Sequence, residues 1–584
     1  MTSVRCAAAL ALGAFLALTT LASAQNPGTS TTFPRGTKVA TAANAELPIK
    51  YAGKPTTADI TAADLMTRLY VFADDSMMGR QVGTRYNLMG TSYIESEVRR
   101  IGLQPAGDNG GYFQNLPLYT YSFDSTSSVS VGDEKLTVAT DFLPIARDER
   151  RIALDGVPVV YAGAGNDSTS WISGDDMAGK IVVLNIAAPG VLPPGSATLR
   201  SRVARAAVVF VVSLDRVPTG QKSGALRTQS LQRDGAPPAS TPSVLITERV
   251  ATLLFGPLDG VKAGAAGKAL SGTIILRKEQ APGRNVVALL PGSNPILRNQ
   301  YVAIGAHNDH IGFNNRPADH DSIRAFNMIA RPQGADSPPV MNATDDQKAR
   351  IRAITDSLHA LHGARRDSIA NGADDDGSGT VSVLEIAESF AAAKTKPRRS
   401  ILFVWHAGEE AGLWGSEFFT DHPTVPRDSI VAQLNMDMVG RGAAADITGE
   451  SKTGGLLHGG PGYLQLVGSR RLSTELGDLM ESVNTKGKYG FNFDYGMDAN
   501  GHPQNIYCRS DHYEYARYGI PIVFMTTGGH SDYHQVTDEP QYIDYAHMTQ
   551  IATLVKEVAT TVANLDHRIV VDKAKPDPKG RCVQ

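Results

Sequence analysis

Residues 301–309 read Tyr-Val-Ala-Ile-Gly-Ala-His-Asn-Asp, an apolar run that passes directly into a histidine and an aspartate. A short apolar run of this kind is typical of a buried strand. The arrangement recurs farther along the chain, where apolar runs precede Glu409-Glu410 and Asp437. In a largely parallel sheet, ligands gather at the edge where the strands end. The pattern therefore indicates both a fold class and the position of a site.

Strand-like runs alternate with helical patterns on both sides of this segment. Candidate strands are Asn285–Leu290, Tyr301–Ala306, Ser400–Trp405, Ile430–Met436 and Ile520–Thr526, and candidate helices are Thr380–Ala393, Tyr463–Val483 and Ile543–Leu565. Such alternation predicts an α/β fold of three layers with a mostly parallel or mixed central sheet. A helical pattern also begins near Thr61 and is broken at Gly102.

A different texture, short β-rich runs separated by turns, covers residues 122–276. A chain of 584 residues is too long for one hydrophobic core. We therefore expect residues 122–276 to be a β-rich domain inserted into a main domain. The main domain is expected at 57–121 and 277–570, followed by a tail at 571–584.

The first residues have the features of a secretory signal. Arg5 precedes an apolar stretch that ends in Ala22-Ser23-Ala24, which predicts a signal peptide at 1–24 and a flexible leader at 25–56. An uncleaved membrane anchor is the alternative. We expect an exported protein, periplasmic or extracellular, without stable membrane association after signal removal. Cys508 and Cys582 could pair in an oxidising compartment, and the sequence leaves this open.

The formal net charge is −3, so nothing points to nucleic acid or an anionic membrane as a partner. The sequence does not indicate an oligomeric state.

Five clusters of acids and histidines lie in expected loops. They are His307-Asn308-Asp309, Ala373-Asp374-Asp375-Asp376-Gly377, Glu409-Glu410, Asn435-Met436-Asp437 and Asp532-Tyr533-His534. Consecutive carboxylates repel one another unless a cation compensates them. Imidazoles combined with carboxylates favour zinc over calcium or magnesium, and the carboxylates suffice for two metals that share a bridging group. A pair of metals can bind a water-derived nucleophile and a substrate carbonyl, and one of the two adjacent glutamates could act as the general base.

These clusters resemble the dinuclear zinc exopeptidases of the bacterial secreted leucyl aminopeptidase type, whose relatives include glutamate carboxypeptidases, the transferrin receptor ectodomain and glutaminyl cyclases. The resembling segments are 304–312, 371–379, 407–416, 435–441, 510–512 and 532–538, together with 78–85 and 101–107 nearer the N-terminus. The likeness runs, with interruptions, from about residue 60 to 565, and its motifs follow the family's order.

The resemblance implies a role for each site residue and two Zn²⁺ ions per chain. His307 and Asp437 would hold one zinc, Glu410 and His534 the other, and Asp375 would bridge them. Glu409 would be the general base that takes a proton from the bridging water, Asp309 would orient the His307 ring, and Tyr507 would stabilise the oxyanion.

The resemblance also implies a protease-associated domain for 122–276 and peptides as substrates. A longer segment separates His307 from Asp375 than in compact members, and its Ala349–Ile369 part has helical spacing, typical of a solvated surface helix or a lid. An aminopeptidase is the function we expect. The alternatives are a carboxypeptidase or glutaminyl-cyclase-like enzyme, and a non-catalytic binding ectodomain, which would have lost metal ligands.

Overall fold

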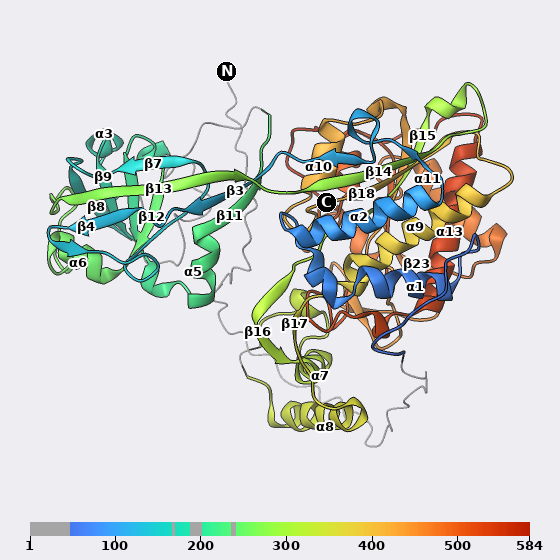
Figure 1. Cartoon of the computed structure of the whole chain (residues 1–584), viewed down its shortest axis with the longest axis horizontal. Helices are drawn as coiled ribbons and strands as arrows, with labels where there is room; N and C mark the ends of the chain where they lie inside the picture. The colour runs from blue at the N-terminus through green and yellow to red at the C-terminus, as the bar shows by residue number, and fades with distance from the viewer. Residues whose placement is uncertain (1–46, 166–169, 187–200, 235–240, 341) are drawn as a thin grey trace. The chain divides into compact units, whose positions relative to one another are not determined.

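The computed structural model describes residues 47–165, 170–186, 201–234, 241–340 and 342–584. The expected signal peptide and most of the expected leader lie outside these ranges. The chain divides into two compact units: unit 1 comprises residues up to Leu116 and Gly283–Gln584, and unit 2 comprises Pro117–Pro282 (Figure 1). Each is described by itself.

Unit 1 is built on a nine-stranded mixed sheet within the described residues. Its order is β1-β14-β18-β15-β19-β24-β22-β23, with β2 also pairing with β14. The strands are β1 (Gln104–Pro105), β2 (Phe113–Asn115), β14 (Arg284–Leu290), β15 (Tyr301–His307), β18 (Ser400–His406), β19 (Ile430–Met436), β22 (Tyr463–Val467), β23 (Asn492–Asp494) and β24 (Ile522–Thr526). Neighbours among β18, β15, β19 and β24 are parallel, so these four strands end at the same edge of the sheet.

Alternating side chains of the central strands pack into two separate cores. In β18, Phe403 and Trp405 belong to one cluster, whereas Leu402 and Val404 belong to the other. The first cluster is covered by α1 (Ala62–Phe72), α2 (Arg85–Arg100), α9 (Gly379–Ala392), α11 (Thr474–Gly487) and α13 (Tyr545–Asn564), most of which lie over the sheet in Figure 1. The second contains residues of α10 (Trp414–Asp421) and α12 (His512–Ala516). The predicted three-layer α/β fold is confirmed.

One predicted helix is wrong over part of its length. Residues Tyr463–Val467 form strand β22, and the helix α11 begins only at Thr474. All five strand residues are buried, and the strand pairs with β24 on one side and β23 on the other. A short apolar run buried on both faces has no periodicity that separates strand from helix, which explains the error.

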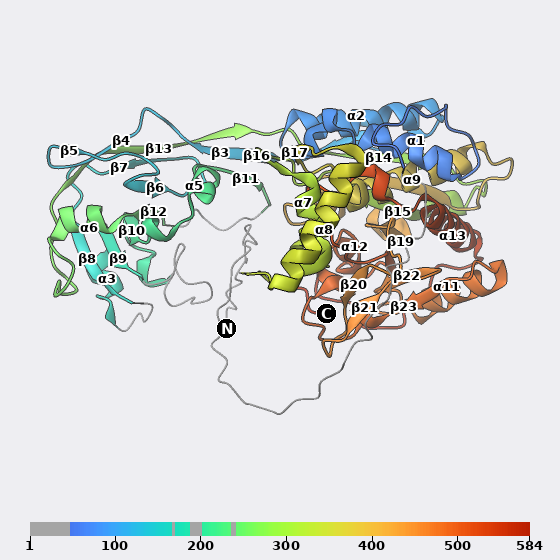
Figure 2. The same cartoon turned by 90° about the horizontal axis from the view of Figure 1, so that it is seen from below.

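The long segment between His307 and Asp375 forms a projection from the sheet (Figures 1 and 2). It contains β16 (Phe313–Asp319), α7 (His320–Ala330), α8 (Asp345–His362) and β17 (Arg366–Ile369), and β16 pairs with β17. Only Thr355 of α8 is buried, as expected of a surface helix. The predicted helix extended too far, however, because residues 366–369 are a strand.

Unit 2 consists of two sheets packed around a shared core. One has the order β6-β12-β10-β9-β8, and the other β11-β3-β13-β4-β5 with β7 beside β13. The strands are β3 (Leu118–Phe123), β4 (Ser128–Val131), β5 (Glu134–Lys135), β6 (Phe142–Pro144), β7 (Arg150–Ala153), β8 (Val159–Ala164), β9 (Ile181–Asn185), β10 (Val208–Val212), β11 (Arg227–Leu231), β12 (Ser243–Ile246) and β13 (Leu270–Gln280). Side chains such as Phe210 and Ile274 come from different sheets and share one cluster. The protease-associated assignment of this unit stays a prediction.

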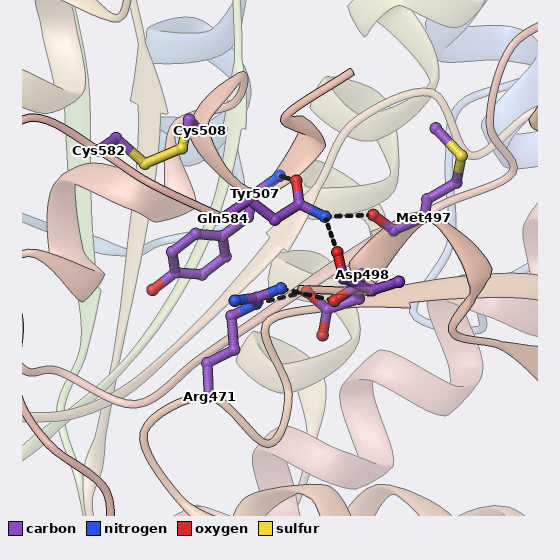
Figure 3. The surroundings of a disulfide bond; sticks show 8 residues. Arg471, Met497, Asp498, Tyr507, Cys508, Cys582 and Gln584 are labelled. Atoms are coloured by element: carbon purple, nitrogen blue, oxygen red, sulfur yellow. Dashed lines mark hydrogen bonds and ion pairs between the residues drawn. A yellow bond between two sulfur atoms is a disulfide. The ribbon is translucent and has the colours of Figure 1, made fainter. Parts of the chain in front are cut away.

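The two cysteines form a disulfide within unit 1 (Figure 3). Cys508 and Cys582 have Cα atoms 5.9 Å apart and join positions 74 residues distant in sequence. Beside the bond, the Gln584 side chain accepts a hydrogen bond from the Tyr507 amide (3.0 Å) and donates to the Met497 carbonyl (2.5 Å). In the chain-entropy treatment, a loop of this size stabilises the fold by about 4 kcal/mol.

None of the helices in the described ranges combines the length and apolarity needed to cross a membrane.

Arg68 of α1 carries a buried charge in the helical layer. Its side chain is 1% exposed and pairs with Glu385 of α9 (Nε–Oε2, 2.8 Å), with Glu388 of the same helix and with Glu97 of α2. This guanidinium therefore links three helices. Breaking a buried ion pair leaves uncompensated charge, which is more costly than losing a surface pair.

We predict that Arg68→Met lowers the free energy of unfolding by about 3–5 kcal/mol, because Glu385 is left buried without its partner. Arg100→Met is the matched control: Arg100 contacts the same Glu97 and Glu388 but is 44% exposed, so about 1 kcal/mol or less is expected. Urea unfolding measures both. Equal losses would show that the buried pair has no special role.

Candidate metal centre

The predicted ligands lie where the parallel strands end. His307 is the last residue of β15, and Asp437 follows β19 directly. Glu410 lies in the turn after β18, and Asp375 lies in the loop that precedes α9. His534 belongs to the loop after β24. The common direction of the strands brings these loops together.

The first group that could hold a metal contains His307, Asp375 and Asp437, whose ligand atoms all lie within 4.8 Å of one another. His307 Nε2 is 3.1 Å from Asp375 Oδ1 and 3.6 Å from Asp437 Oδ1. Ligands held about 2.0–2.2 Å from a tetrahedral zinc are separated by about 3.3–3.6 Å. The spacing therefore suits a zinc ion.

The second group contains Asp375, Glu410 and His534, and the structure adds His310 to it. His534 Nε2 is 3.0 Å from Asp375 Oδ2 and 2.9 Å from Glu410 Oε2. His310 Nδ1 lies 2.7 Å from Glu410 Oε1, yet neither atom has a hydrogen-bond partner of acceptable geometry. Two atoms that lie close together without a hydrogen bond between them are arranged like two ligands of one cation. His310 was not predicted as a ligand, because its position three residues after His307 does not by itself place it beside Glu410.

Asp375 is the only residue shared by the two groups found in this region of the described chain. Its Oδ1 faces His307 and its Oδ2 faces His534, as a bridging carboxylate requires. The flanking aspartates have other partners. Asp374 Oδ1 accepts from the Gly440 amide (2.6 Å), and Asp376 accepts from the amides of His307 (3.0 Å) and Gly379 (2.9 Å). Of the three aspartates, the middle one therefore has the position that a ligand shared by both groups would need.

The loop that carries Asp375 depends on a glycine and on a buried arginine. Gly372 has φ +56°, and a Cβ there would lie 2.3 Å from the Asp375 carbonyl oxygen and 2.5 Å from His310 Cγ. Arg80 is fully buried and donates to the carbonyls of Asn371 (2.6 Å) and Gly372 (2.9 Å). Burial lowers the pKa of Arg80 to about 10, so it stays charged at neutral pH. The N-terminal part of unit 1 thus shapes the metal loop.

Asp309 connects the His307 ring to the turn after β18. His307 Nδ1 is 3.2 Å from the backbone carbonyl oxygen of Asp309 and 3.7 Å from its carboxylate. The carboxylate accepts instead from the amides of Gly408 (2.7 Å) and Glu409 (3.2 Å). Asp309 therefore orients the imidazole mainly through its backbone, and its side chain fixes the turn that carries the candidate base.

Glu409 is placed beside the first group without belonging to it. Its Oε2 lies 4.0 Å from His307 Nε2, and its side chain is 12% exposed. Burial raises the pKa of Glu409 well above its usual value, and the neighbouring charges of Asp437 and Glu410 act in the same direction. A carboxylate with a raised pKa is suited to accept a proton near neutral pH.

Asp437 is held by a serine from another loop. Ser510 Oγ donates to Asp437 Oδ2 (2.7 Å) and accepts from the Asn435 amide group (3.0 Å). This hydrogen bond leaves Oδ1 of Asp437 facing His307. Hydrogen bonds to the ligand carboxylates orient the ligands of many metal sites.

The projection braces the loop that carries His534. Arg324 of α7 donates to Asp532 (2.5 Å), and the Ala335 amide donates to the Tyr533 carbonyl (3.1 Å). The Tyr533 ring also stacks on His534, with ring centroids 4.1 Å apart. The projection therefore supports a ligand loop, and its role as a lid stays a prediction.

Tyr507 lies in the second hydrophobic core of unit 1. It is 5% exposed, packs edge-on against His512 and Tyr513, and lies under the Arg471 guanidinium at 4.6 Å. In the part of the chain that the structure describes, neither metal-binding group contains it. Its role at the oxyanion stays a prediction.

The residues present fit a pair of dications. Within the described part of the chain, buried atoms that face the two groups have no hydrogen-bond partner, among them His307 Nε2, His310 Nδ1, Asp375 Oδ2 and Glu410 Oε1. Burial acts to lower the pKa of His307, but Asp437 and other carboxylates outweigh it and raise the pKa well above its usual value. Without metal, a proton on the His307 ring would compensate the neighbouring carboxylates, and metal binding would displace it.

Comparisons with known proteins agree with this chemistry. Residues 285–559 match the family described as peptidase family M28. Leucine aminopeptidase 1 of Paracoccidioides brasiliensis (strain Pb03) is 31% identical over 210 residues, which cover 33% of this chain and 49% of that protein. Its counterpart in Penicillium rubens (strain ATCC 28089 / DSM 1075 / NRRL 1951 / Wisconsin 54-1255) is 30% identical over 225 residues, 35% of this chain and 53% of that protein. The chain thus spans about half the length of the curated relatives it matches.

Among solved structures, the aminopeptidase from Aneurinibacillus sp. strain AM-1 has a TM-score of 0.44 at 16% identity, covering 88% of this chain and 97% of that one.

We predict that Asp375→Asn weakens zinc binding more than Asp309→Asn does. Asp375 is expected to serve both metals, whereas changes that only affect ligand orientation typically cost about 10–100-fold. Titration with zinc against a chromogenic chelator measures both affinities. Equal, mild effects would mean that Asp374 or Asp376 is the bridge.

Proposed function

We propose that this chain, whose residues 285–559 match peptidase family M28, is a zinc-dependent aminopeptidase that removes N-terminal residues from peptides. The observation that carries the proposal is the pair of metal-binding groups joined through Asp375, with Glu409 beside them. His307 and Asp437 would hold one zinc, Glu410 and His534 the other. His310 would complete the second set.

Two zinc ions held there would polarise the substrate carbonyl and make water more acidic. Glu409 then takes a proton from the attacking water at its Oε2, and returns it to the leaving amine. Asp309 keeps Glu409 in place by accepting hydrogen bonds from its amide and from that of Gly408. Ser510 holds the ligand carboxylate of Asp437 by donating a hydrogen bond to its Oδ2.

The charges around the centre favour a substrate with a free amino terminus. Arginines that contact the loop 530–539 are each paired with a carboxylate: Arg324 and Arg441 with Asp532, Arg365 with Glu539, and Arg509 with Asp336. Recognition of a peptide carboxylate needs a cation that is available to it. Buried carboxylates such as Asp309 and Asp511 add negative charge beyond the ligands, which attracts a positively charged terminus. The similarity to leucine aminopeptidases supports the same choice.

We further infer export to an oxidising compartment. The signal-like sequence at 1–24 and the Cys508–Cys582 disulfide support this independently. Periplasmic and extracellular locations both satisfy these observations. We also propose that unit 2 is a protease-associated-like module.

The proposal is tested by assaying aminoacyl and carboxy-terminal chromogenic substrates, with and without a strong chelator. We expect hydrolysis of the aminoacyl substrates, loss of activity with the chelator, and recovery with zinc or cobalt. Activity only on carboxy-terminal substrates would identify a carboxypeptidase. If hydrolysis of these substrates continues after all metal has been removed, the metal mechanism is refuted.

We predict that Glu409→Gln lowers kcat by about 10²–10⁴-fold with little change in KM, because the amide keeps the shape of the side chain but cannot accept a proton. Metal content should stay unchanged. Glu410→Gln is the matched variant, and its loss of activity should accompany loss of metal. Steady-state kinetics and elemental analysis distinguish the two. If Glu409→Gln empties a metal site while Glu410→Gln keeps both, their roles are exchanged.

A further inference from the structure

Three consecutive backbone amides of the loop that carries Asp375 converge on one residue, Asp538. The Asp374 amide donates to both carboxylate oxygens of Asp538 (3.0 Å to each), and the Asp375 amide donates to Oδ2 (3.1 Å). The Ala373 amide donates to the backbone carbonyl of Asp538 (3.1 Å). Successive amides that point to one side form a concavity suited to an anion. In this loop the anion is a side chain of the protein itself.

Asp538 belongs to the same loop as His534, which it follows by four residues. Two turns shape this loop. The Gln535 amide donates to the Asp532 carbonyl (3.0 Å), and the Asp538 amide donates to the Gln535 carbonyl (3.2 Å). The Thr537 hydroxyl also donates to the Asp532 carboxylate (2.7 Å). These bonds fix the position of Asp538 relative to that of His534.

A third ligand loop reaches the same carboxylate. Asp538 is completely buried, so its charge needs compensation in addition to the amides. Arg441 contributes to it: its Nη2 lies 3.8 Å from Asp538 Oδ1 and 2.9 Å from Asp532 Oδ2. Arg441 follows the predicted ligand Asp437 by four residues. The segments of three predicted ligands therefore meet at Asp538.

The carboxylate of Asp374, on the same loop, has partners of its own. Its Oδ1 accepts from the Gly440 amide (2.6 Å), and its Oδ2 lies 3.2 Å from His530 Nε2. The Asp532 amide donates to His530 Nδ1 (3.2 Å). Because Nδ1 accepts, the ring proton resides on Nε2, the nitrogen that faces Asp374. The Asp374 carboxylate is thus compensated separately from the amides of its loop.

We propose that Asp538 is a positioning residue of the metal centre, which sets the place of the shared ligand Asp375 relative to His534. The inference rests on the proposed function, because it assumes that metal ions bind at Asp375. The two carboxylate oxygens of Asp375 lie 3.1 Å from His307 Nε2 and 3.0 Å from His534 Nε2. A shift of the Asp375 backbone moves both oxygens together. Losing the anchor of its amide is therefore expected to weaken the binding of both metals.

Asparagine at position 538 tests this role with little change of size. An asparagine side chain has one acceptor oxygen and an NH₂ group that only donates. The Asp374 amide lies 3.0 Å from both oxygens of Asp538, so the NH₂ group would face this amide in either orientation. A donor would then oppose a donor, and the loop must move away from it.

The test compares the full-length wild type with Asp538→Asn and with the control Asp64→Asn. Asp64 is also a buried carboxylate of unit 1, and it accepts from the Thr57 amide (3.2 Å) and hydroxyl (2.7 Å). Competition with a chromogenic chelator measures the affinity for each zinc ion. The visible spectrum of the Co²⁺-loaded protein reports ligand geometry, and the Tm of the metal-free protein reports the stability of the fold.

We expect Asp538→Asn to weaken the binding of both zinc ions by about 10–100-fold, as is typical when a group that orients ligands is changed. Its Co²⁺ spectrum should change as well, and at saturating zinc kcat should fall more than KM rises. Asp64→Asn should keep the wild-type affinities and spectrum. If Asp538→Asn folds poorly, Asp538→Glu repeats the comparison, because it keeps the charge beside Arg441 but displaces the carboxylate by one methylene.

Wild-type zinc affinities and an unchanged Co²⁺ spectrum in Asp538→Asn would overturn the proposal, and so would a loss confined to one of the two ions. Both readouts are measured without substrate. A wild type that binds two zinc ions yet does not hydrolyse aminoacyl substrates would therefore count against the aminopeptidase proposal alone. Unchanged metal binding in Asp538→Asn would count against the role of Asp538 alone.

Discussion

A carboxylate removed from water needs a positive charge or several hydrogen-bond donors beside it, and unit 1 buries many carboxylates at the edge where its parallel strands end. The carboxylates of Asp309, Asp374 and Asp376 accept hydrogen bonds from backbone amides of neighbouring segments. The side chains of Asp375 and Glu410 instead face imidazoles of the candidate centre. Aspartates that are adjacent in sequence therefore differ in their contacts: Asp374 and Asp376 accept hydrogen bonds from backbone amides, whereas the Asp375 side chain faces His307 and His534.

Segments remote in sequence supply the donors that make this division possible. Arg80, far from the ligands along the chain, fixes the carbonyls of the loop that presents Asp375. Arg324, from the long segment after His307, fixes Asp532 in the loop of His534. Arg80 donates from both terminal nitrogens of its planar guanidinium, which a lysine at that position would not reproduce. The N-terminal helices and the projection are therefore parts of the site, although neither provides a predicted ligand.

Much of this arrangement could be predicted from the sequence, because the central strands are continuous apolar runs that end in polar residues. The strand containing Val302 and Ile304 and the helix beginning at Gly379 follow directly from such patterns. The run at 463–467 was misassigned as helix because full burial removes the alternation that identifies a strand. The part played by His310 could not be deduced, since its closeness to Glu410 arises from the pairing of β15 with β18. The same holds for Asp309, whose carboxylate has partners 99 and 100 residues away.

The disulfide has a further consequence for the last residues of the chain. Residues 565–584 follow the last helix without regular structure, and most of their side chains are exposed. Irregular, exposed segments are the preferred points of proteolytic attack, because they can open locally and enter a protease cleft. The bond from Cys582 to Cys508 prevents this stretch from detaching, and Cys508 is only two residues from the serine that holds Asp437. A cut within this stretch would thus leave its end covalently attached beside the loop that contacts Asp437.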